Sequence, residues 1–370
     1  MTAELFIGLM SGTSMDGIDA VLVELADSKF VVRHSIGVEY EASLGARLRD
    51  IAQRPDDGHI DDLGALHIAV AYAFADAACQ LMNEAGVAAT DVAAIGSHGQ
   101  TVLHRPDDEY PFSLQLGDPA TLAARTEVTV VADFRSADIA LGGQGAPLVP
   151  AFHRWAFGDS SELRAVINIG GIANVTLLDP TGVTTGYDTG PGNVLLDQWY
   201  RENTGAPFDV RGDWAATGAV DDALLAQLLE DPYFARPAPK STGTDYFNRD
   251  WLQEQLRQFD GTAVPADIQA TLSELTATTI TAAIPEAQTA AVCGGGARND
   301  DLMKRLRRRL RPCSVTSTAD WGVDPDWVEA VAFAWLARQR MKGQPSNVPA
   351  VTGAKSEVSL GGIFLAPSTR

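Results

Sequence analysis

An aspartate in a glycine-rich segment is the strongest candidate for acid–base chemistry in this sequence. Residues 186–193 read Gly-Tyr-Asp-Thr-Gly-Pro-Gly-Asn and precede a helix predicted over residues 194–200. Because Gly and Pro restrict the backbone to a turn, the carboxylate of Asp188 is expected to point in a fixed direction. A carboxylate held in this way can act as a general base, which contributes about 10²–10⁴ in rate. The competing interpretation is an aspartate that only caps its own turn.

Two short turns that contain glycine are candidates for phosphate binding. Residues 12–17 read Gly-Thr-Ser-Met-Asp-Gly, and residues 170–174 read Gly-Gly-Ile-Ala-Asn. Glycine lets backbone N–H groups approach an anion closely, and the hydroxyls of Thr13 and Ser14 add donors. Neither is a Walker A loop, since no Gly-Lys-Ser/Thr follows. Each alone is typical of an ordinary turn, but two such turns on duplicated domains predict a grip on one phosphate chain.

A third glycine element, residues 293–299, reads Cys-Gly-Gly-Gly-Ala-Arg-Asn and separates an apolar run from a basic segment. Three glycines at the end of a strand expose bare backbone, against which a flat nucleoside can lie. The alternative is the dinucleotide-binding turn of a dehydrogenase. Its spacing is not G-x-G-x-x-G, and it comes too late in the chain to open a Rossmann unit. The sequence therefore favours the nucleoside.

Composition and charge exclude several classes of protein. The 370 residues include 45% hydrophobic and 21% charged residues, which is typical of a folded chain and not of a disordered one. With 28 Lys and Arg against 48 Asp and Glu, the net charge is −20, so binding to nucleic acid or to an anionic membrane surface is not expected. The three cysteines are far apart and predict neither disulfides nor structural zinc.

Neither a signal peptide nor a membrane span is expected from the sequence. The first residues lack a basic segment and run directly into a strand-like pattern. The longest apolar helix candidate, around residues 66–82, is interrupted by Asp76 and by small residues. These patterns predict a cytoplasmic protein.

The elements that must position the glycine turns form two similar hairpins. Around the first turn, strands are predicted at residues 5–10 and 18–25, and around the second at residues 164–169 and 175–178. The two hairpins align at an offset of 162 residues, from Ile7 to Ile169. Unless the likeness is a coincidence of two ordinary hairpins, it predicts a duplicated α/β fold.

The remaining pattern alternates strands with helices. Strands are predicted at residues 31–38, 92–97, 128–132, 290–293 and 358–365, and helices at residues 61–84, 221–229, 267–284, 299–310 and 327–341, the last with Asp324 as its N-cap. Polar loops follow the strands that end at residues 97 and 132, and open α/β sheets place ligands at such ends. Because a domain averages ~150 residues, we expect one at 1–160, joined by the tail 345–370, and a second at 161–344.

Six blocks of the sequence together resemble the anhydro-N-acetylmuramic acid kinase family. They lie between residue 6 and about residue 365, and their residues are 8–19 (GLMSGTSMDGID), 96–101 (GSHGQT), 131–135 with 142–148 (VADFR and GGQGAPL), 168–174 (NIGGIAN), 188–193 (DTGPGN) and 294–299 (GGGARN). The resemblance implies the actin/hexokinase/Hsp70-type ATPase fold, with two duplicated domains around a central cleft.

The resemblance also implies a reaction. The family uses ATP and Mg²⁺ to convert 1,6-anhydro-N-acetylmuramic acid into N-acetylmuramic acid 6-phosphate and ADP in cell-wall recycling. Water adds at the anomeric carbon and opens the internal ether, while the freed O6 takes the γ-phosphoryl group. Two alternatives stay open: a non-catalytic sugar- or nucleotide-sensing protein on the same fold, and a hydrolase that only opens the anhydro bond.

Carried onto matching positions, the resemblance assigns roles to particular residues. Asp188 would activate the water, with direct attack of its carboxylate on the sugar as the less favoured role. The ATP-binding residues would be Gly12, Thr13, Ser14, Met15, Asp16, Gly17, Ile18, Asp19, Gly170, Gly171, Asn174, Gly294, Gly295 and Gly296. The sugar would contact Ser97, His98, Gln100, Arg135 and Glu329.

Three of the substrate residues have a simpler structural alternative. Arg135 is the natural partner of the lactyl carboxylate, because its fork can bind both oxygens, but it could pair with Asp133 or Asp138 instead. His98 could only satisfy loop backbone groups, and Glu329 could only favour the helix dipole. No ligand cluster identifies protein contacts to Mg²⁺, which ATP itself would hold. A homodimer is what the family suggests.

Overall fold

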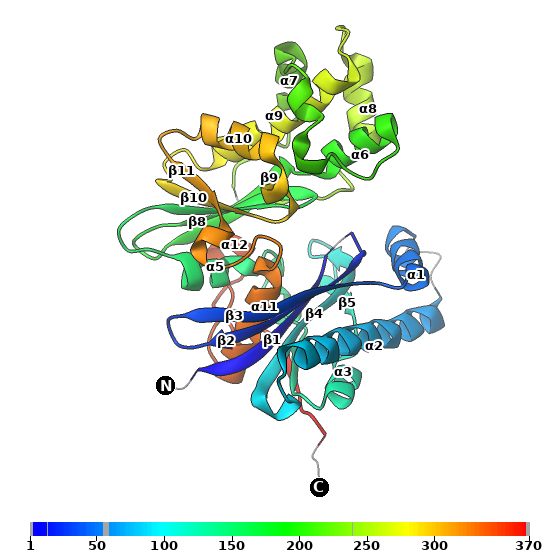
Figure 1. The fold of residues 1–370 in the computed structure, drawn as a ribbon, viewed down its shortest axis with the longest axis vertical. Coiled ribbons are helices and arrows are strands. Elements are labelled where there is room, and N and C mark those ends of the chain that lie inside the picture. Colours follow the sequence, from blue (N-terminus) through cyan, green and yellow to red (C-terminus); the bar gives the residue numbers. More distant parts are fainter. Residues whose placement is uncertain (1–2, 13, 55–58, 239, 368–370) are drawn as a thin grey trace. The chain divides into compact units, whose positions relative to one another are not determined.

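A computed structural model describes residues 3–12, 14–54, 59–238 and 240–367, and the chain divides into two compact units (Figure 1). Unit 1 comprises Met1–Ala156 and Trp327–Arg370, and unit 2 comprises Phe157–Asp326. The chain thus returns to unit 1 earlier than the residue 345 expected from the sequence. Residues 327–344 contain a helix that packs on the sheet of unit 1, which explains the difference.

Unit 1 is built around a seven-stranded mixed sheet in the order β12-β6-β4-β1-β2-β3, with β5 paired to β4. The strands are β1 (Glu4–Ser11), β2 (Gly17–Leu25), β3 (Phe30–Glu39), β4 (Val92–Arg105), β5 (Phe112–Leu116), β6 (Val130–Ala132) and β12 (Gly362–Phe364). β1, β2 and β3 form an antiparallel meander, and β4 lies parallel to β1.

Two helices cover opposite faces of this sheet. Ile7 and Leu9 of β1 join a core with α2 (Ile60–Ala85), whereas Gly8 lies against α11 (Val328–Met341). Side chains of a strand alternate between its faces, so α2 and α11 lie on different sides. The other helices of unit 1 are α1 (Ala42–Gln53), α3 (Pro119–Thr126), α4 (Ser136–Ala140), α5 (Val149–Phe157) and α12 (Pro349–Thr352).

Close packing of α11 depends on two glycines that are neighbours in the sheet. Gly8 and Gly96 are paired across β1 and β4. A side chain at Gly8 would overlap the backbone oxygen of Ala330, and one at Gly96 would overlap that of Phe333. Glycine at both positions therefore lets the helix backbone approach the sheet directly.

The longest helix, α2, begins at Ile60 and ends at Ala85, with Gly86 in the left-handed conformation as its C-cap. Its apolar window has a mean hydropathy of 1.4, so in the described part of the chain it is long and apolar enough to cross a membrane. The expectation that no helix approaches such a span is wrong on length and composition. Half of that window is buried inside the structure.

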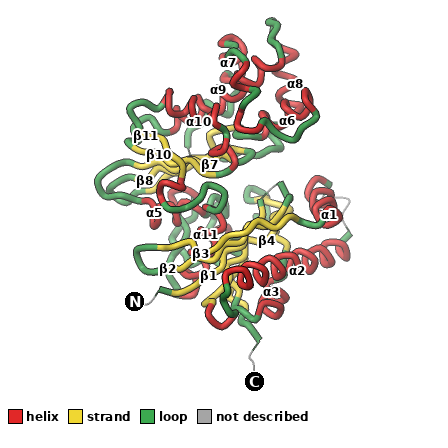
Figure 2. The backbone as a smooth tube through the Cα atoms, in the orientation of Figure 1, coloured by secondary structure: helices red, strands yellow, loops and turns green. Residues whose placement is uncertain are grey.

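Unit 2 repeats the sheet topology of unit 1. Its five-stranded sheet has the order β11-β10-β7-β8-β9. The strands are β7 (Arg164–Ile169), β8 (Ile172–Leu178), β9 (Thr184–Pro191), β10 (Thr289–Cys293) and β11 (Ser314–Ser317). As in unit 1, a three-stranded antiparallel meander is extended on its first strand by parallel strands. Figure 2 shows the strands of this sheet in yellow and the helices of the unit in red. The duplication predicted from the two hairpins is confirmed, and the fold is the duplicated ATPase type.

Helices of unit 2 form two groups. The first core joins the sheet to α9 (Pro265–Ala283) and α10 (Asp300–Arg309), and a second core lies among α9, α6 (Val194–Thr204), α7 (Asp222–Leu229) and α8 (Arg249–Gln258). The buried carboxylate of Glu274 in α9 binds Arg305 Nη1 of α10 at 2.7 Å. Part of the region between residues 205 and 248, including α7, is packed in this second core.

Three local predictions differ from the structure. β4 does not end at residue 97 but continues through His98 and Gln100 to Arg105, because β5 pairs with its second half. Asp188 lies within β9 and not in a turn, since that strand pairs with β8 up to Pro191. α11 has Trp327, and not Asp324, as its N-cap residue.

Candidate active site

The first glycine turn connects β1 to β2 in unit 1. Met15 adopts a φ of 56°, and its buried side chain joins the core, as does that of Ile18. Any contact of these two residues with a nucleotide would therefore come from the backbone. Ser14 and Asp16 are exposed, and Gly12, Gly17 and Asp19 are partly buried. Thr13 lies outside the described residues.

The turn is held by contacts that the sequence did not reveal. The side-chain nitrogen of Gln100, Nε2, donates to Gly12 O at 3.0 Å, and Ser11 Oγ donates to Gln100 Oε1 at 2.7 Å. Gln100 is fully buried, so it supports the turn from the interior of unit 1. Arg49 Nη1 donates to Met15 O at 3.2 Å and lies 3.7 Å from Asp16 Oδ1, which brings a cation to the turn.

Arg135 follows β6 and is bound by two acceptors of unit 1. Its Nη1 donates to Gly145 O at 2.7 Å, and its Nη2 lies 2.8 Å from His98 Nε2. Burial lowers the pKa of His98 to about 3, with a further contribution from the Arg135 charge, so the imidazole is neutral. Burial also lowers the pKa of Arg135, to about 10, which leaves the guanidinium charged at neutral pH.

The structural alternative for Arg135 does not occur. Asp138 instead accepts from Gly145 N, Asn347 Nδ2 and Thr352 Oγ1, each at 2.8 Å. Asp133 accepts from Ser136 Oγ at 2.6 Å. Arg135 Nε is buried and has no hydrogen-bond partner among the residues that the structure describes. The Nε–H of the guanidinium is thus not used by the described part of the protein.

Glu329 lies in the first turn of α11 and interacts electrostatically with Arg135. Burial raises the pKa of Glu329, and the Arg135 charge opposes that rise. Ser97 and His98 are also buried, on β4. The structure therefore brings Arg135, His98 and Glu329 together, with His98 binding the arginine.

The second glycine turn connects β7 to β8 in unit 2. Gly192 N donates to Gly171 O, and Asn193 N donates to Gly170 O, both at 2.8 Å. A side chain at Gly192 would overlap the Gly170 oxygen. The turn is thus fastened to the start of α6 through its carbonyl groups.

The triple glycine lies against this same turn. Gly294 has a φ of 76°, and a side chain there would lie 2.8 Å from the carbonyl oxygen of Ile169. A side chain at Gly296 would overlap that of Ile169, the last residue of β7. Because Gly170 follows Ile169 directly, Gly170, Gly171 and Gly294–296 gather at one edge of the sheet of unit 2.

Asp188 lies near the same edge, where it is paired with Asn174 across β9 and β8. Its Oδ2 accepts from Thr242 N at 3.0 Å, and its carbonyl oxygen accepts from Tyr233 Oη at 2.6 Å. Burial raises the pKa of Asp188 to about 6, and the Thr242 N–H opposes the rise. At neutral pH the side chain is a carboxylate with a stronger affinity for protons than a free aspartate.

Some residues of this site could not be found from the sequence. Thr242 and Tyr233 contact Asp188, although they are 54 and 45 residues away along the chain. Both lie in a segment that carries no motif. Asn193 Nδ2 donates to Ile169 O at 3.1 Å, and the only available signal was its place in the block Asp-Thr-Gly-Pro-Gly-Asn.

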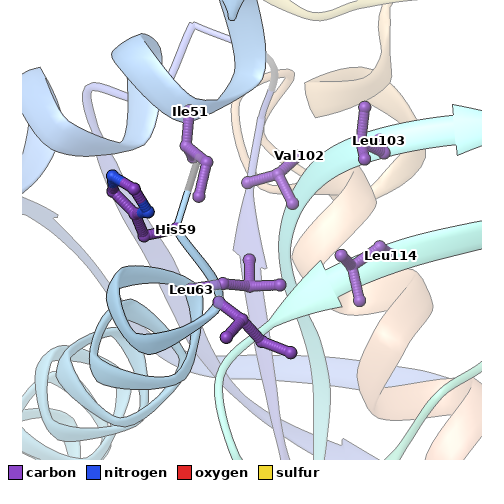
Figure 3. Close-up of a pocket in the computed structure, with 7 residues that line it drawn as sticks. Ile51, His59, Leu63, Val102, Leu103 and Leu114 are labelled. Carbon is purple, nitrogen blue, oxygen red and sulfur yellow. The ribbon is translucent and has the colours of Figure 1, made fainter. Parts of the chain in front are cut away.

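Unit 1 also contains a cavity whose lining includes none of the candidate site residues (Figure 3). It is lined by one histidine and six aliphatic side chains: His59, Ile51, Ile60, Leu63, Val102, Leu103 and Leu114. Nor do the described residues contain a cluster of three or more His, Cys, Asp or Glu side chains that could hold a metal ion. The chemistry-bearing groups therefore remain those at the sheet edges of each unit.

Comparison with known proteins agrees with this geometry. The family profile described as anhydro-N-acetylmuramic acid kinase matches residues 4–366. The chain is 47% identical over 374 residues to the anhydro-N-acetylmuramic acid kinase of Coxiella burnetii (strain Dugway 5J108-111), covering 98% of both chains. It is 49% identical over 369 residues to that of Xanthomonas campestris pv. campestris (strain 8004), covering 97% of both.

Among solved structures, a ROK family glucokinase from Streptomyces griseus in complex with glucose and AMPPNP aligns with a TM-score of 0.41 at 16% identity. The alignment covers 90% of this chain and 99% of that one. The fold is assigned from the topology of the two sheets and not from this alignment. The match over nearly the whole length and the identity to curated relatives decide the family: the chain is a member of the anhydro-N-acetylmuramic acid kinase family.

Proposed function

We propose that this protein is an ATP-dependent kinase that opens 1,6-anhydro-N-acetylmuramic acid with water and phosphorylates O6. Its products would be N-acetylmuramic acid 6-phosphate and ADP. Family membership supports the reaction, and one observation carries it to particular residues. A carboxylate with a raised pKa, Asp188, lies at the same sheet edge as the glycine turns Gly170–Gly171 and Gly294–Gly296.

In this reaction Asp188 is the general base. The water oxygen bonds to the anomeric carbon, the bond from that carbon to O6 breaks, and the water proton passes to the carboxylate. O6 then bonds to the γ-phosphorus while the bond to the ADP oxygen breaks. A base whose pKa is near the working pH combines a useful ionised fraction with a strong affinity for the proton, and burial gives Asp188 this property.

The nucleotide would contact both kinds of glycine element. In unit 2, Gly170, Gly171 and Asn174 would face phosphate groups, and Gly294–Gly296 the nucleoside. In unit 1, the turn at residues 12–19 would contribute backbone donors, with Arg49 nearby as a cation. Phosphoryl transfer depends mainly on position and electrostatics, which backbone N–H groups can supply.

Arg135 would bind the lactyl carboxylate of the sugar. Its Nε is the buried donor without a protein partner among the described residues, and its other two nitrogens are oriented by Gly145 and His98. Charge-assisted bonds of this kind are about twice as strong as neutral ones. Glu329, held beside Arg135, would accept from a sugar hydroxyl, while the buried Ser97, His98 and Gln100 would support the pocket.

Mg²⁺ would be held by the phosphate oxygens of ATP, where it neutralises charge that develops during transfer. Carboxylate oxygens are ligands that Mg²⁺ accepts, and Asp16 and Asp188 would be the candidates for a direct contact with the ion. We further propose a cytoplasmic location, no nucleic-acid or membrane partner, and a homodimer.

One incubation separates this function from its alternatives. The protein is mixed with ATP, Mg²⁺ and 1,6-anhydro-N-acetylmuramic acid, and ADP and phosphorylated sugar are measured in the same samples. We expect equal amounts of both. Ring-opened sugar without ADP would instead identify a hydrolase, and binding without turnover would identify a sensing protein.

A further inference from the structure

Three hydrogen bonds from one segment of unit 2 reach Asp188. Tyr233 Oη donates to the carbonyl oxygen of Asp188 at 2.6 Å, and the amide nitrogen of Asp188 donates to Lys240 O at 3.1 Å. Thr242 N donates to Oδ2 of its carboxylate at 3.0 Å. The backbone and the side chain of Asp188 are thus both bound by residues of one segment. The motif that contains Asp188 supplies none of these contacts.

The residues that hold Asp188, which are Tyr233, Lys240 and Thr242, lie in a segment that is held in place by further hydrogen bonds. Asp231 accepts from Tyr233 N at 2.8 Å, from Trp251 Nε1 at 2.9 Å and from Tyr246 Oη at 3.0 Å. Lys240 Nζ donates to Tyr233 O at 3.2 Å and lies over the ring of Tyr233. Tyr233 is buried, with 1% of its surface exposed. A donor fixed in this way can orient a neighbouring group without moving itself.

The two oxygens of the carboxylate have different surroundings. Oδ2 is bound to the Thr242 N–H, whereas Oδ1 receives no hydrogen bond from the described residues. A carboxylate oxygen that already accepts a hydrogen bond is the weaker acceptor for a further proton. Tyr233 interacts electrostatically with Asp188. The other charged or titratable groups nearby, Tyr187, Arg236 and Lys240, interact with Tyr233.

We propose that Tyr233 and the backbone N–H of Thr242 are positioning groups, which hold Asp188 so that Oδ1 takes the proton from the attacking water. The proposal depends on the role of Asp188 as the general base. It adds that Tyr233 and Thr242 set both the direction and the basicity of this carboxylate. Neither group touches the sugar.

The first test replaces the phenol. Y233F removes the hydrogen bond to the Asp188 carbonyl but keeps the buried ring. Y246F is the matched control, because the Tyr246 hydroxyl binds Asp231 and not Asp188. We expect Y233F to lower kcat by about 10-fold with KM for ATP unchanged, since the loss affects orientation of the base alone. Y246F is expected to lower kcat less than Y233F does, since it leaves the hydrogen bond from Tyr233 to Asp188 in place.

The second test removes the backbone donor. T242P lacks the N–H that binds Oδ2, and T242A, which keeps it, is the comparator. The N–H stabilises the carboxylate anion, so its loss raises the pKa of Asp188. We therefore expect the acid limb of kcat/KM against pH to lie at higher pH in T242P than in T242A. A role in folding alone would lower thermal stability without moving this limb.

The outcomes separate the proposal from the function on which it depends. If T242P is folded by its melting temperature and its acid limb coincides with that of T242A, the proposal is wrong. If T242P does not fold, Y233F decides, and a kcat equal to that of Y246F overturns the proposal. Normal turnover in D188N would instead remove the base assignment itself.

Discussion

Arg135 Nη2 donates a hydrogen bond of 2.8 Å to His98 Nε2. An arginine nitrogen can only donate, so Nε2 is the accepting nitrogen and the proton of the neutral imidazole is assigned to Nδ1. Burial lowers the pKa of His98 to about 3, which keeps this arrangement over the physiological range. The histidine of the block Gly-Ser-His-Gly-Gln-Thr thus acts on an arginine that follows a different strand.

Replacing Arg135 by lysine tests its proposed partner on the sugar. R135K keeps a positive charge but loses the planar fork and the bond to His98. We expect KM for the anhydromuramic sugar to rise by ~10–100-fold, as for the loss of ~1.5–3 kcal/mol in a charge-assisted bond. The same comparison with 1,6-anhydro-N-acetylglucosamine, which lacks the lactyl group, is the control. An equal penalty on both sugars in steady-state kinetics would show that Arg135 does not bind the lactyl carboxylate.

Asp188→Asn tests the general base. The amide is nearly isosteric and its oxygen can still accept from Thr242 N, so the fold and ligand binding should be retained. It cannot take a proton, and we expect kcat to fall by ~10³ or more. Calorimetric titration with nucleotide and sugar checks binding, and coupled assay of ADP checks turnover. Turnover near that of the parent protein would contradict the assignment.

The pH dependence follows from the same carboxyl group. Burial raises the pKa of Asp188 to about 6, and the base is active only when ionised. Activity should therefore be lost as pH falls through about 6, measured as kcat/KM. Burial also raises the pKa of Asp197 to about 6, so D197N is the control. Loss of the limb in D197N, or a midpoint near 4 in the parent protein, would be inconsistent with this account.

Chelation of divalent metal should weaken nucleotide binding. The chain carries a net charge of −20, and its glycine turns contain no lysine. Without Mg²⁺ the negative charge of ATP would face backbone donors and few cations in an acidic protein. We expect the Kd for ATP, measured by titration calorimetry, to rise by at least ~10-fold in EDTA. The same affinity with and without the chelator would mean that protein cations balance the phosphates.

Gly8→Ala tests the close approach of α11 to the sheet. The added carbon would overlap the Ala330 oxygen, and the helix must shift to accommodate it. We expect the free energy of unfolding to fall by at least ~1–3 kcal/mol, the cost of overpacking a core. Gly64→Ala in α2, where the added carbon meets no atom within 4 Å, is the control and should gain ~0.5–1 kcal/mol. Equal stabilities in chemical denaturation would refute the packing argument.

Much of the fold could be predicted because its signals are local. The two hairpins at an offset of 162 residues indicated a duplication, and both sheets confirm it with a shared strand order. The helix predicted at residues 61–84 is α2, which is one residue longer at each end. Local signals failed where pairing between strands decided the structure. The loop expected after residue 97 is a strand because Gln100 pairs with β1 and residues 100–105 pair with β5.

The sequence by itself determined the family, the glycine turns and the identity of Asp188 as the candidate base, since each depends on residues that are adjacent in the chain. Only the tertiary structure decided that His98 binds Arg135, that Gln100 supports the first turn, and that Thr242 and Tyr233 hold Asp188. These contacts join segments 37 to 88 residues apart. Packing of whole elements brings such groups within hydrogen-bond distance, and packing leaves no short-range pattern in the sequence.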